Sequence, residues 1–191
     1  MAKKLFFFFA FFSFLLYKPQ QQSIKMGVGD NFLLQAAIQF TDLTSNFVSI
    51  IFGDGYQESR IKTSVPYVFA DYRYPVSEIV SVGAQVGYTD FTRHLTYYED
   101  TTTTEAVRYQ YFVLMPGAEV RYRQRDKLKM YGNFMMGVAS IKSSSSTAND
   151  SGLGFAFQLN PFGVSYGDRI AGFAEVGIGY SLFQAGIKFS F

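Results

Sequence analysis

Residues 183–191, Phe-Gln-Ala-Gly-Ile-Lys-Phe-Ser-Phe, decide the fold, because apolar side chains alternate along them with polar or small ones. One face would hold Phe183, Ala185, Ile187, Phe189 and Phe191. The other face would hold Gln184, Gly186, Lys188 and Ser190. Successive side chains of a β-strand point to opposite faces, so the stretch predicts a strand with one apolar and one polar face. A sheet with lipid on one side and a wet interior on the other needs such strands.

The same period of two recurs upstream. Residues 170–180 place the acidic Glu175 on a face with glycines, and glycine at alternate positions disfavours a helix. Further alternating segments lie at residues 68–74, 80–89, 112–122, 128–138 and 153–160. Residues 24–40 complete the set, either as one long strand or as two pieces joined at a bulge near Asp30. The count of eight strands is even, as in single-chain bacterial outer-membrane barrels.

The connections alternate between short and long. Short polar turns are expected at residues 75–78, 124–127 and 165–168, and longer loops at residues 41–60, 92–105 and 142–151. The last two loops contain runs of four threonines and four serines, which cannot pack a core. Transmembrane barrels show this asymmetry, with tight periplasmic turns and longer outer loops. The connection at residues 179–182 is short for an outer loop.

The N-terminus has the pattern of a secretory signal. Lys3 and Lys4 precede an apolar run at residues 5–16, which is too short for a spanning helix of about 20 residues. We therefore expect a signal peptide at residues 1–22 and a barrel domain at residues 23–191. No small-x-small pattern marks the cleavage site, which is placed loosely at residues 19–23.

The composition favours a membrane barrel and excludes several other classes. Aromatic residues reach 19%, with 22 Phe and 14 Tyr, while charged residues are only 17%. Barrels use aromatic residues at both rims of their lipid-facing band. The net charge of +2 with scattered basic residues does not indicate nucleic-acid binding. Because the chain has no Cys and one His, we expect no disulfide, no metal site and no cofactor.

Several stretches resemble a known family. They are Asn160–Gly163, Gly172–Tyr180, Gly186–Phe191, Val65–Tyr67 and Asp71–Pro75. The chain over residues 60–191 is similar to the small outer-membrane β-barrel or porin-family proteins of Bacteroidota. This resemblance implies an eight-stranded, up-and-down barrel of the OmpX kind, also like the OmpA membrane domain. Functional residues are generally not defined in this family, so no catalytic residue is carried over.

The C-terminal aromatics indicate a partner. Phe189 and Phe191 share a face at the very end of the chain, and this resembles the assembly signal that the barrel-assembly machinery reads. The alternative is an ordinary edge strand in a soluble sandwich.

The alternation also predicts which charged side chains point inward. They are Lys25, Asp71, Arg73, Glu119, Arg121, Arg123, Lys129, Arg169, Glu175 and Lys188. An eight-stranded barrel is just wide enough for side chains to fill, and buried charges need partners. We expect a polar plug of ion pairs in which Glu119 and Glu175 lie among lysines and arginines. The alternative is a narrow or gated pore whose ion pairs exchange partners.

The single histidine, His94, is the one candidate for catalysis. Some outer-membrane barrels modify lipid A with a rim histidine, and Asp90, Glu99 or Asp100 could orient His94 as a general base. The alternative is an exposed loop residue without a catalytic role.

Together these patterns predict an exported outer-membrane protein with its N-terminus in the periplasm. It would be a monomer that contacts outer-membrane lipid and lipopolysaccharide, with its loops displayed to an extracellular ligand or host surface. The rival functions are passage of small or apolar solutes, a lipid-modifying activity at His94, and a soluble lipocalin-like binder. The last would reverse the two faces, placing apolar side chains inside.

Overall fold

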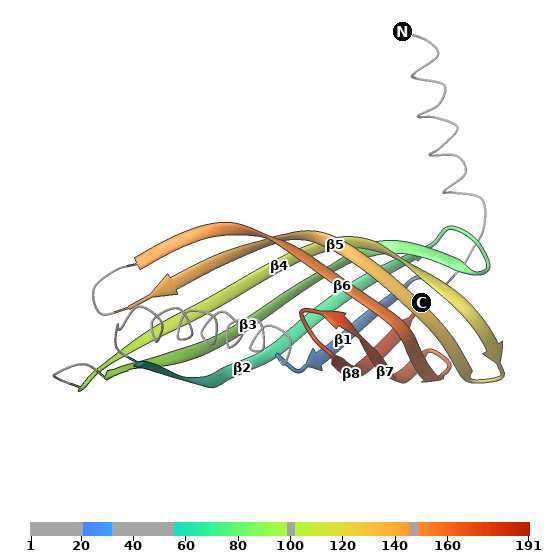
Figure 1. Ribbon diagram of the computed structural model, residues 1–191. Coiled ribbons are helices and arrows are strands. Elements are labelled where there is room, and N and C mark those ends of the chain that lie inside the picture. The colour runs from blue at the N-terminus through green and yellow to red at the C-terminus, as the bar shows by residue number, and fades with distance from the viewer. Residues whose placement is uncertain (1–20, 32–55, 99–101, 146–148) are drawn as a thin grey trace, which may run out of the picture.

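The computed structural model describes residues 21–31, 56–98, 102–145 and 149–191 as a closed barrel of antiparallel strands (Figure 1). The strands in chain order are β1 (Ser23–Gly29), β2 (Tyr56–Pro75), β3 (Val80–Tyr98), β4 (Thr102–Arg125), β5 (Leu128–Ser144), β6 (Asn149–Gly167), β7 (Ile170–Gly179) and β8 (Phe183–Ser190). Each strand pairs with its neighbours in sequence, and β1 pairs with β8 to close the barrel. The predicted eight-stranded, up-and-down fold is confirmed. Among the described residues, no helix is long and apolar enough to cross a membrane.

Irregularities in the pairing allow the sheet to curve. Register shifts interrupt the β2–β3 pairing between Thr63 and Val68, and the β4–β5 pairing between Arg121 and Arg123. A further shift lies in β6 between Leu159 and Phe162. Bulges of this kind increase the local twist and bend of a strand, and closing a small barrel requires such curvature.

The alternation puts apolar side chains on the outer wall, whereas the inward face carries both polar side chains and a cluster of buried apolar ones. On β8, Gln184 and Lys188 are buried while Phe183 and Ile187 are exposed. On β6, Gln158 is 0% exposed and Phe155 is 69% exposed. A lipocalin-like binder would place charged side chains on its outer wall, whereas here that wall is apolar and Lys188 is buried, so the structure supports the predicted direction of the charged face.

The expected loops at residues 92–105 and 142–151 are wrong, because most of these residues are strand. β3 pairs with β4 as far as Tyr98 and Thr102, and β5 pairs with β6 as far as Ser144 and Asn149. Inter-strand hydrogen bonds use backbone groups, so polar side chains can continue a water-exposed hairpin that has no apolar core. Threonine also favours strands, and Thr102, Thr103 and Thr104 belong to β4.

The short turns are confirmed at the other end of the barrel, at residues 76–79, 126–127 and 168–169. Asp126 adopts a φ of 48° in the two-residue turn between β4 and β5, a left-handed conformation that Asp tolerates. In the first predicted strand, β1 ends at Gly29, and residues 32–40 lie outside the described residues. So do residues 1–20 of the expected signal peptide and residues 41–55 of the first loop, whereas residues 56–60 belong to β2.

The strands β2–β6 extend well beyond β1, β7 and β8 (Figure 1). Pairing of β1 with β2 stops at Tyr67, and pairing of β7 with β6 stops at Gln158. Within the described residues, β2–β6 alone therefore form the wall beyond these positions. We call this side the hairpin end, and the side with the short turns the turn end.

Candidate functional site

The centre of the barrel interior is a lysine held between two carboxylates from other strands. The Lys25 Nζ, on β1, lies 2.6 Å from Glu119 Oε2 on β4 and 2.7 Å from Glu175 Oε1 on β7. All three side chains are buried. The ammonium therefore ties together strands that are not neighbours in the sheet.

Glu175 is fixed by neutral donors as well. The Tyr131 hydroxyl donates to Oε1 at 2.8 Å, and the amides of Asn133 and Asn160 donate to Oε2 at 2.9 and 2.6 Å. Hydrogen bonds to a charged acceptor are stronger than those between neutral groups. With Lys25, this carboxylate accepts bonds from three strands, which offsets much of the cost of burying its charge.

A second ion pair lies beside the first. Arg73 Nε donates to Asp71 Oδ2 at 2.9 Å, and both side chains come from the inward face of β2. Lys25 Nζ is 3.9 Å from the same Asp71 oxygen, and Lys188 Nζ is 3.6 Å from Glu119 Oε1. We name Lys25, Asp71, Arg73, Glu119, Glu175 and Lys188 the interior ion cluster. It holds three cations and three carboxylates, so its charges balance.

Aromatic rings fill the interior on the hairpin side of this cluster. Phe91 stacks on Tyr111 with ring centroids 5.7 Å apart, and Tyr67 lies 5.8 Å from Tyr180. These rings belong to one buried apolar cluster that also includes Val113, Met115, Met135, Ala139 and Ala156. The interior thus has two packed layers, one ionic and one aromatic.

Glycines on the wall make room for the large interior rings. A Cβ added at Gly163 would lie 2.5 Å from the Tyr131 ring, and one at Gly27 would lie 2.8 Å from the Phe69 ring. Because real Cβ atoms do not approach so closely, the ring positions depend on glycine at the paired position of the neighbouring strand.

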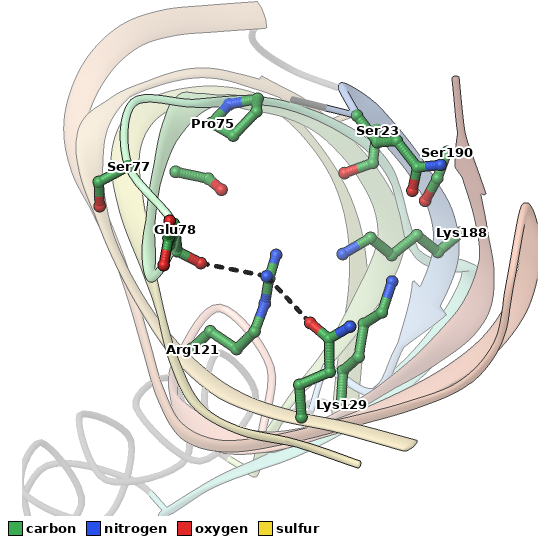
Figure 2. Close-up of a pocket in the computed structure, with 11 residues that line it drawn as sticks. Ser23, Pro75, Ser77, Glu78, Arg121, Lys129, Lys188 and Ser190 are labelled. Carbon is green, nitrogen blue, oxygen red and sulfur yellow. Dashed lines mark hydrogen bonds between the residues drawn. The ribbon is translucent and has the colours of Figure 1, made fainter. Parts of the chain in front are cut away.

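The turn end of the interior is open and basic. A cavity of about 320 Å³ is lined there by Gln21, Ser23, Pro75, Ser77, Glu78, Ser81, Arg121, Gln124, Lys129, Lys188 and Ser190. Figure 2 shows the side chains of Arg121, Lys129 and Lys188 pointing into it. Arg121 Nη1 donates to the Glu78 carbonyl and to Gln124 Oε1, each at 3.1 Å.

The predicted inward charges lie in the interior ion cluster, at the basic cavity, or outside the interior. Asp71, Arg73, Glu119, Glu175 and Lys188 lie in the interior ion cluster with Lys25. Arg121 and Lys129 line the basic cavity instead.

Two of the predicted inward charges are not in the interior. Arg169 lies exposed in the turn between β6 and β7, because its strand begins only at Ile170. Arg123 is exposed because the register shift between Arg121 and Arg123 changes the phase of the alternation. The alternation over residues 128–138 and 153–160 also directs Tyr131, Asn133 and Asn160 inward, but it does not assign them to the cluster, since they carry no charge.

His94 lies in a strand and not in a loop. It pairs with Arg60 on β2 and Ala106 on β4. Asp90, on the same strand, is bonded to Arg108, Gln110 and Tyr88. Glu99 and Asp100 lie outside the described residues, and the described part of the chain contains no group of three or more potential metal ligands.

No family model matches the chain, and no curated protein sequence matches it. Its fold is similar to two crystal structures of Ail, the attachment invasion locus protein of Yersinia pestis. The structure in complex with the heparin analogue sucrose octasulfate has a TM-score of 0.46 and 14% identity, covering 90% of this chain and 100% of that one. The other has a TM-score of 0.42 and 13% identity, covering 89% of this chain and 95% of that one.

Proposed function

We propose that the protein is an integral bacterial outer-membrane barrel with a sealed interior, whose hairpins contact an extracellular ligand or a host surface. The observation that carries the membrane placement is the apolar outer wall around a charged interior. Exposed apolar patches of a few hundred Å² already indicate an interaction surface, and here the apolar side chains surround the barrel. They include Met26, Phe112, Phe134, Val138, Leu153, Phe155, Ile178 and Ile187.

The height of the apolar wall fits a lipid bilayer. On β4 the outward side chains from Phe112 to Tyr122 span ten positions, or about 34 Å along an antiparallel strand. A strand tilt of roughly 45° reduces this to about 25 Å, the height of the lipid-facing band of outer-membrane barrels.

The two edges of the band differ. Near the turn end, Tyr122, Phe162 and Tyr166 are exposed on the outer wall, and aromatic residues of this kind form the girdles of membrane barrels. Beyond Phe112, toward the hairpin end, the next outward residues of β4 are the polar Gln110 and Arg108. The side chain of Asp90 pairs with Arg108 at this level.

We place the turn end in the periplasm and the hairpin end outside. The turns at residues 76–79, 126–127 and 168–169 are short, whereas β2–β6 extend beyond the other strands at the hairpin end. Short periplasmic turns and larger outer segments are the common arrangement of these barrels. Both the start of β1 and Phe191 lie at the turn end, since the Phe191 N–H bonds the Gln22 carbonyl at 3.0 Å. This orientation puts the N-terminus of the barrel in the periplasm.

The packed interior supports a surface function over transport. An eight-stranded barrel has room for side chains and little more, and here balanced charges and stacked rings occupy it. A pore would require the Lys25 bonds to Glu119 and Glu175 to break, which exposes buried charges at high cost. The extended hairpins of β2–β6 remain as the part available to a partner.

Tryptophan quenching tests the membrane placement, because the chain has no Trp of its own. We would refold Phe155→Trp and, as the matched control, Asp150→Trp from the exposed hairpin of the same strand. Phospholipids brominated on their acyl chains should quench the first strongly and the second weakly. Quenching of Phe155→Trp by aqueous iodide, with none by brominated lipid, would place this wall in water and overturn the proposal.

Cysteine labelling tests the orientation, since the chain has no Cys. A membrane-impermeant maleimide should label Asp150→Cys on intact cells, and Lys127→Cys, in the β4–β5 turn, only after the outer membrane is permeabilised. The reverse pattern would show that the hairpins face the periplasm.

Adhesion tests the surface role. Cells that express the wild type should bind an epithelial cell layer more than cells with an empty vector. A variant in which an Asn-Gly turn replaces residues 143–150 should lose this binding while keeping the heat-shifted gel mobility of a folded barrel. Equal binding by wild-type and empty-vector cells would remove this role.

A further inference from the structure

We propose that the cavity at the turn end, which we name the basic pocket, binds the phosphate or carboxylate groups of a small anionic solute. The basic pocket is defined by Arg121, Lys129 and Lys188 together with the serines Ser23, Ser81 and Ser190. This inference concerns the end opposite the hairpins, so it goes beyond the surface role and does not depend on it.

The pocket has an excess of positive charge. The three cations face the cavity together, and the only acidic side chain among the residues lining it is Glu78, from the exposed β2–β3 turn. Lys188 pairs with Glu119 at 3.6 Å within the charge-balanced interior ion cluster, so the excess comes from Arg121 and Lys129. Arg121 donates to a backbone carbonyl and to a glutamine, which are neutral acceptors.

Of the three cations, Lys129 gives the strongest indication of a bound anion. Among the ion pairs formed by the described residues, none includes Lys129, although its side chain is half-buried and directed into the cavity (Figure 2). Nearby lysines and arginines repel one another, and an anion between them would remove that repulsion. Its turn neighbour Lys127, by contrast, is exposed and lies 3.5 Å from Asp168.

The hydrogen-bonding groups suit an oxyanion. Lysine and arginine have only donors to offer, and serine hydroxyls can donate. Arginine and lysine both bind phosphate and carboxylate oxygens, the first with a planar fork and the second as a point charge.

The size of the pocket limits the solute. A volume of about 320 Å³ corresponds to roughly ten water molecules at about 30 Å³ each. It is also at the lower end of the range for small-molecule sites. Because Lys188 belongs to both the pocket and the interior ion cluster, the floor of the pocket is the packed interior, and a bound solute would stop there.

The test uses the full-length mature chain, refolded in a neutral detergent at low salt. Isothermal titration with pyrophosphate and, separately, with citrate distinguishes phosphate from carboxylate chemistry. We expect saturable binding of at least one of them, weakened at least tenfold by Lys129→Gln and by Arg121→Gln. The control Lys127→Gln should change the Kd less than twofold, since Lys127 lies outside the pocket but carries the same charge.

The expected site can be checked independently. Amide chemical shifts of Ser23, Ser81 and Ser190 should move on titration, while those of Ala139 at the hairpin end of the interior should not. Heat-shifted gel mobility shows whether each variant is folded. If either Lys129→Gln or Arg121→Gln does not fold, the other variant carries the test. No saturable binding of either anion by the wild type would overturn the proposal. If Lys127→Gln lowered the affinity for the anion as much as Lys129→Gln and Arg121→Gln do, the proposal would also be overturned, since binding would then depend on net charge alone.

Discussion

Replacing Lys25 by methionine should lower the free energy of unfolding by about 3–5 kcal/mol, the usual cost of removing one partner from a buried ion pair. Lys25 bonds Glu119 at 2.6 Å and Glu175 at 2.7 Å. Methionine has a similar length and leaves little void, so the loss reports mainly on the stranded carboxylates. With a urea dependence of roughly 2 kcal/mol per M, the midpoint of unfolding in lipid vesicles should fall by about 2 M.

The two carboxylates should not contribute equally. Glu175 keeps three neutral donors when Lys25 is removed, whereas Glu119 keeps only Lys188 at 3.6 Å among the ion pairs of the described residues. Adding Glu119→Gln to Lys25→Met should therefore recover a large part of the stability, and a double-mutant cycle would measure the coupling.

The matched control is Lys127→Met, which removes an exposed pair with Asp168 and should cost less than about 1 kcal/mol. If Lys25→Met also costs less than about 1 kcal/mol, or if Glu119→Gln lowers the stability of Lys25→Met further, the interior ion cluster does not have the strength assigned to it.

Three further changes test the wall of the barrel and its assembly. Gly163→Ala should lower the free energy of unfolding by about 1–3 kcal/mol, because the added methyl group overpacks against the Tyr131 ring. The control Gly172→Ala, where a Cβ meets nothing within 4 Å, should be nearly neutral in the same urea unfolding assay. Leu114→Arg, within the apolar band, should cost about 2–4 kcal/mol in vesicles and Leu128→Arg, beside a turn, about 0–1 kcal/mol; equal costs would contradict the position of the band. Phe191→Ala should reduce the folded barrel recovered from outer membranes of growing cells but not its refolding in detergent, and an equal loss in both would mean that Phe191 acts in stability and not in assembly.

Much of the barrel is predictable because its signal is local. The alternation in residues 183–191 and 170–179 reflects two different environments on the two sides of one wall, so each strand carries the information by itself. The same rule placed Lys25, Glu119 and Glu175 inside. Their mutual contacts follow from barrel closure, which brings β1, β4 and β7 around one narrow interior.

The sequence pattern does not predict features that depend on the pairing between strands. Runs of Thr and Ser resemble loops, yet Thr102–Thr104 and Ser143–Ser144 are paired with the neighbouring strand of a hairpin. The exposure of Arg123 depends on a register shift at Arg121, and a bulge of this kind has no clear mark in the alternation. The neutral donors Asn133 and Asn160 could be placed inward, but their convergence on one carboxylate depends on the register between strands.

The measurement that tests the sealed barrel most directly is single-channel conductance in a planar bilayer. Wild-type protein, shown to be folded by heat-shifted gel mobility, should give no steady ion current, and Glu119→Gln and Glu175→Gln should be compared beside it. A steady wild-type current that changes in these two variants would contradict the account, because the interior ion cluster would then be a gate and the protein a pore.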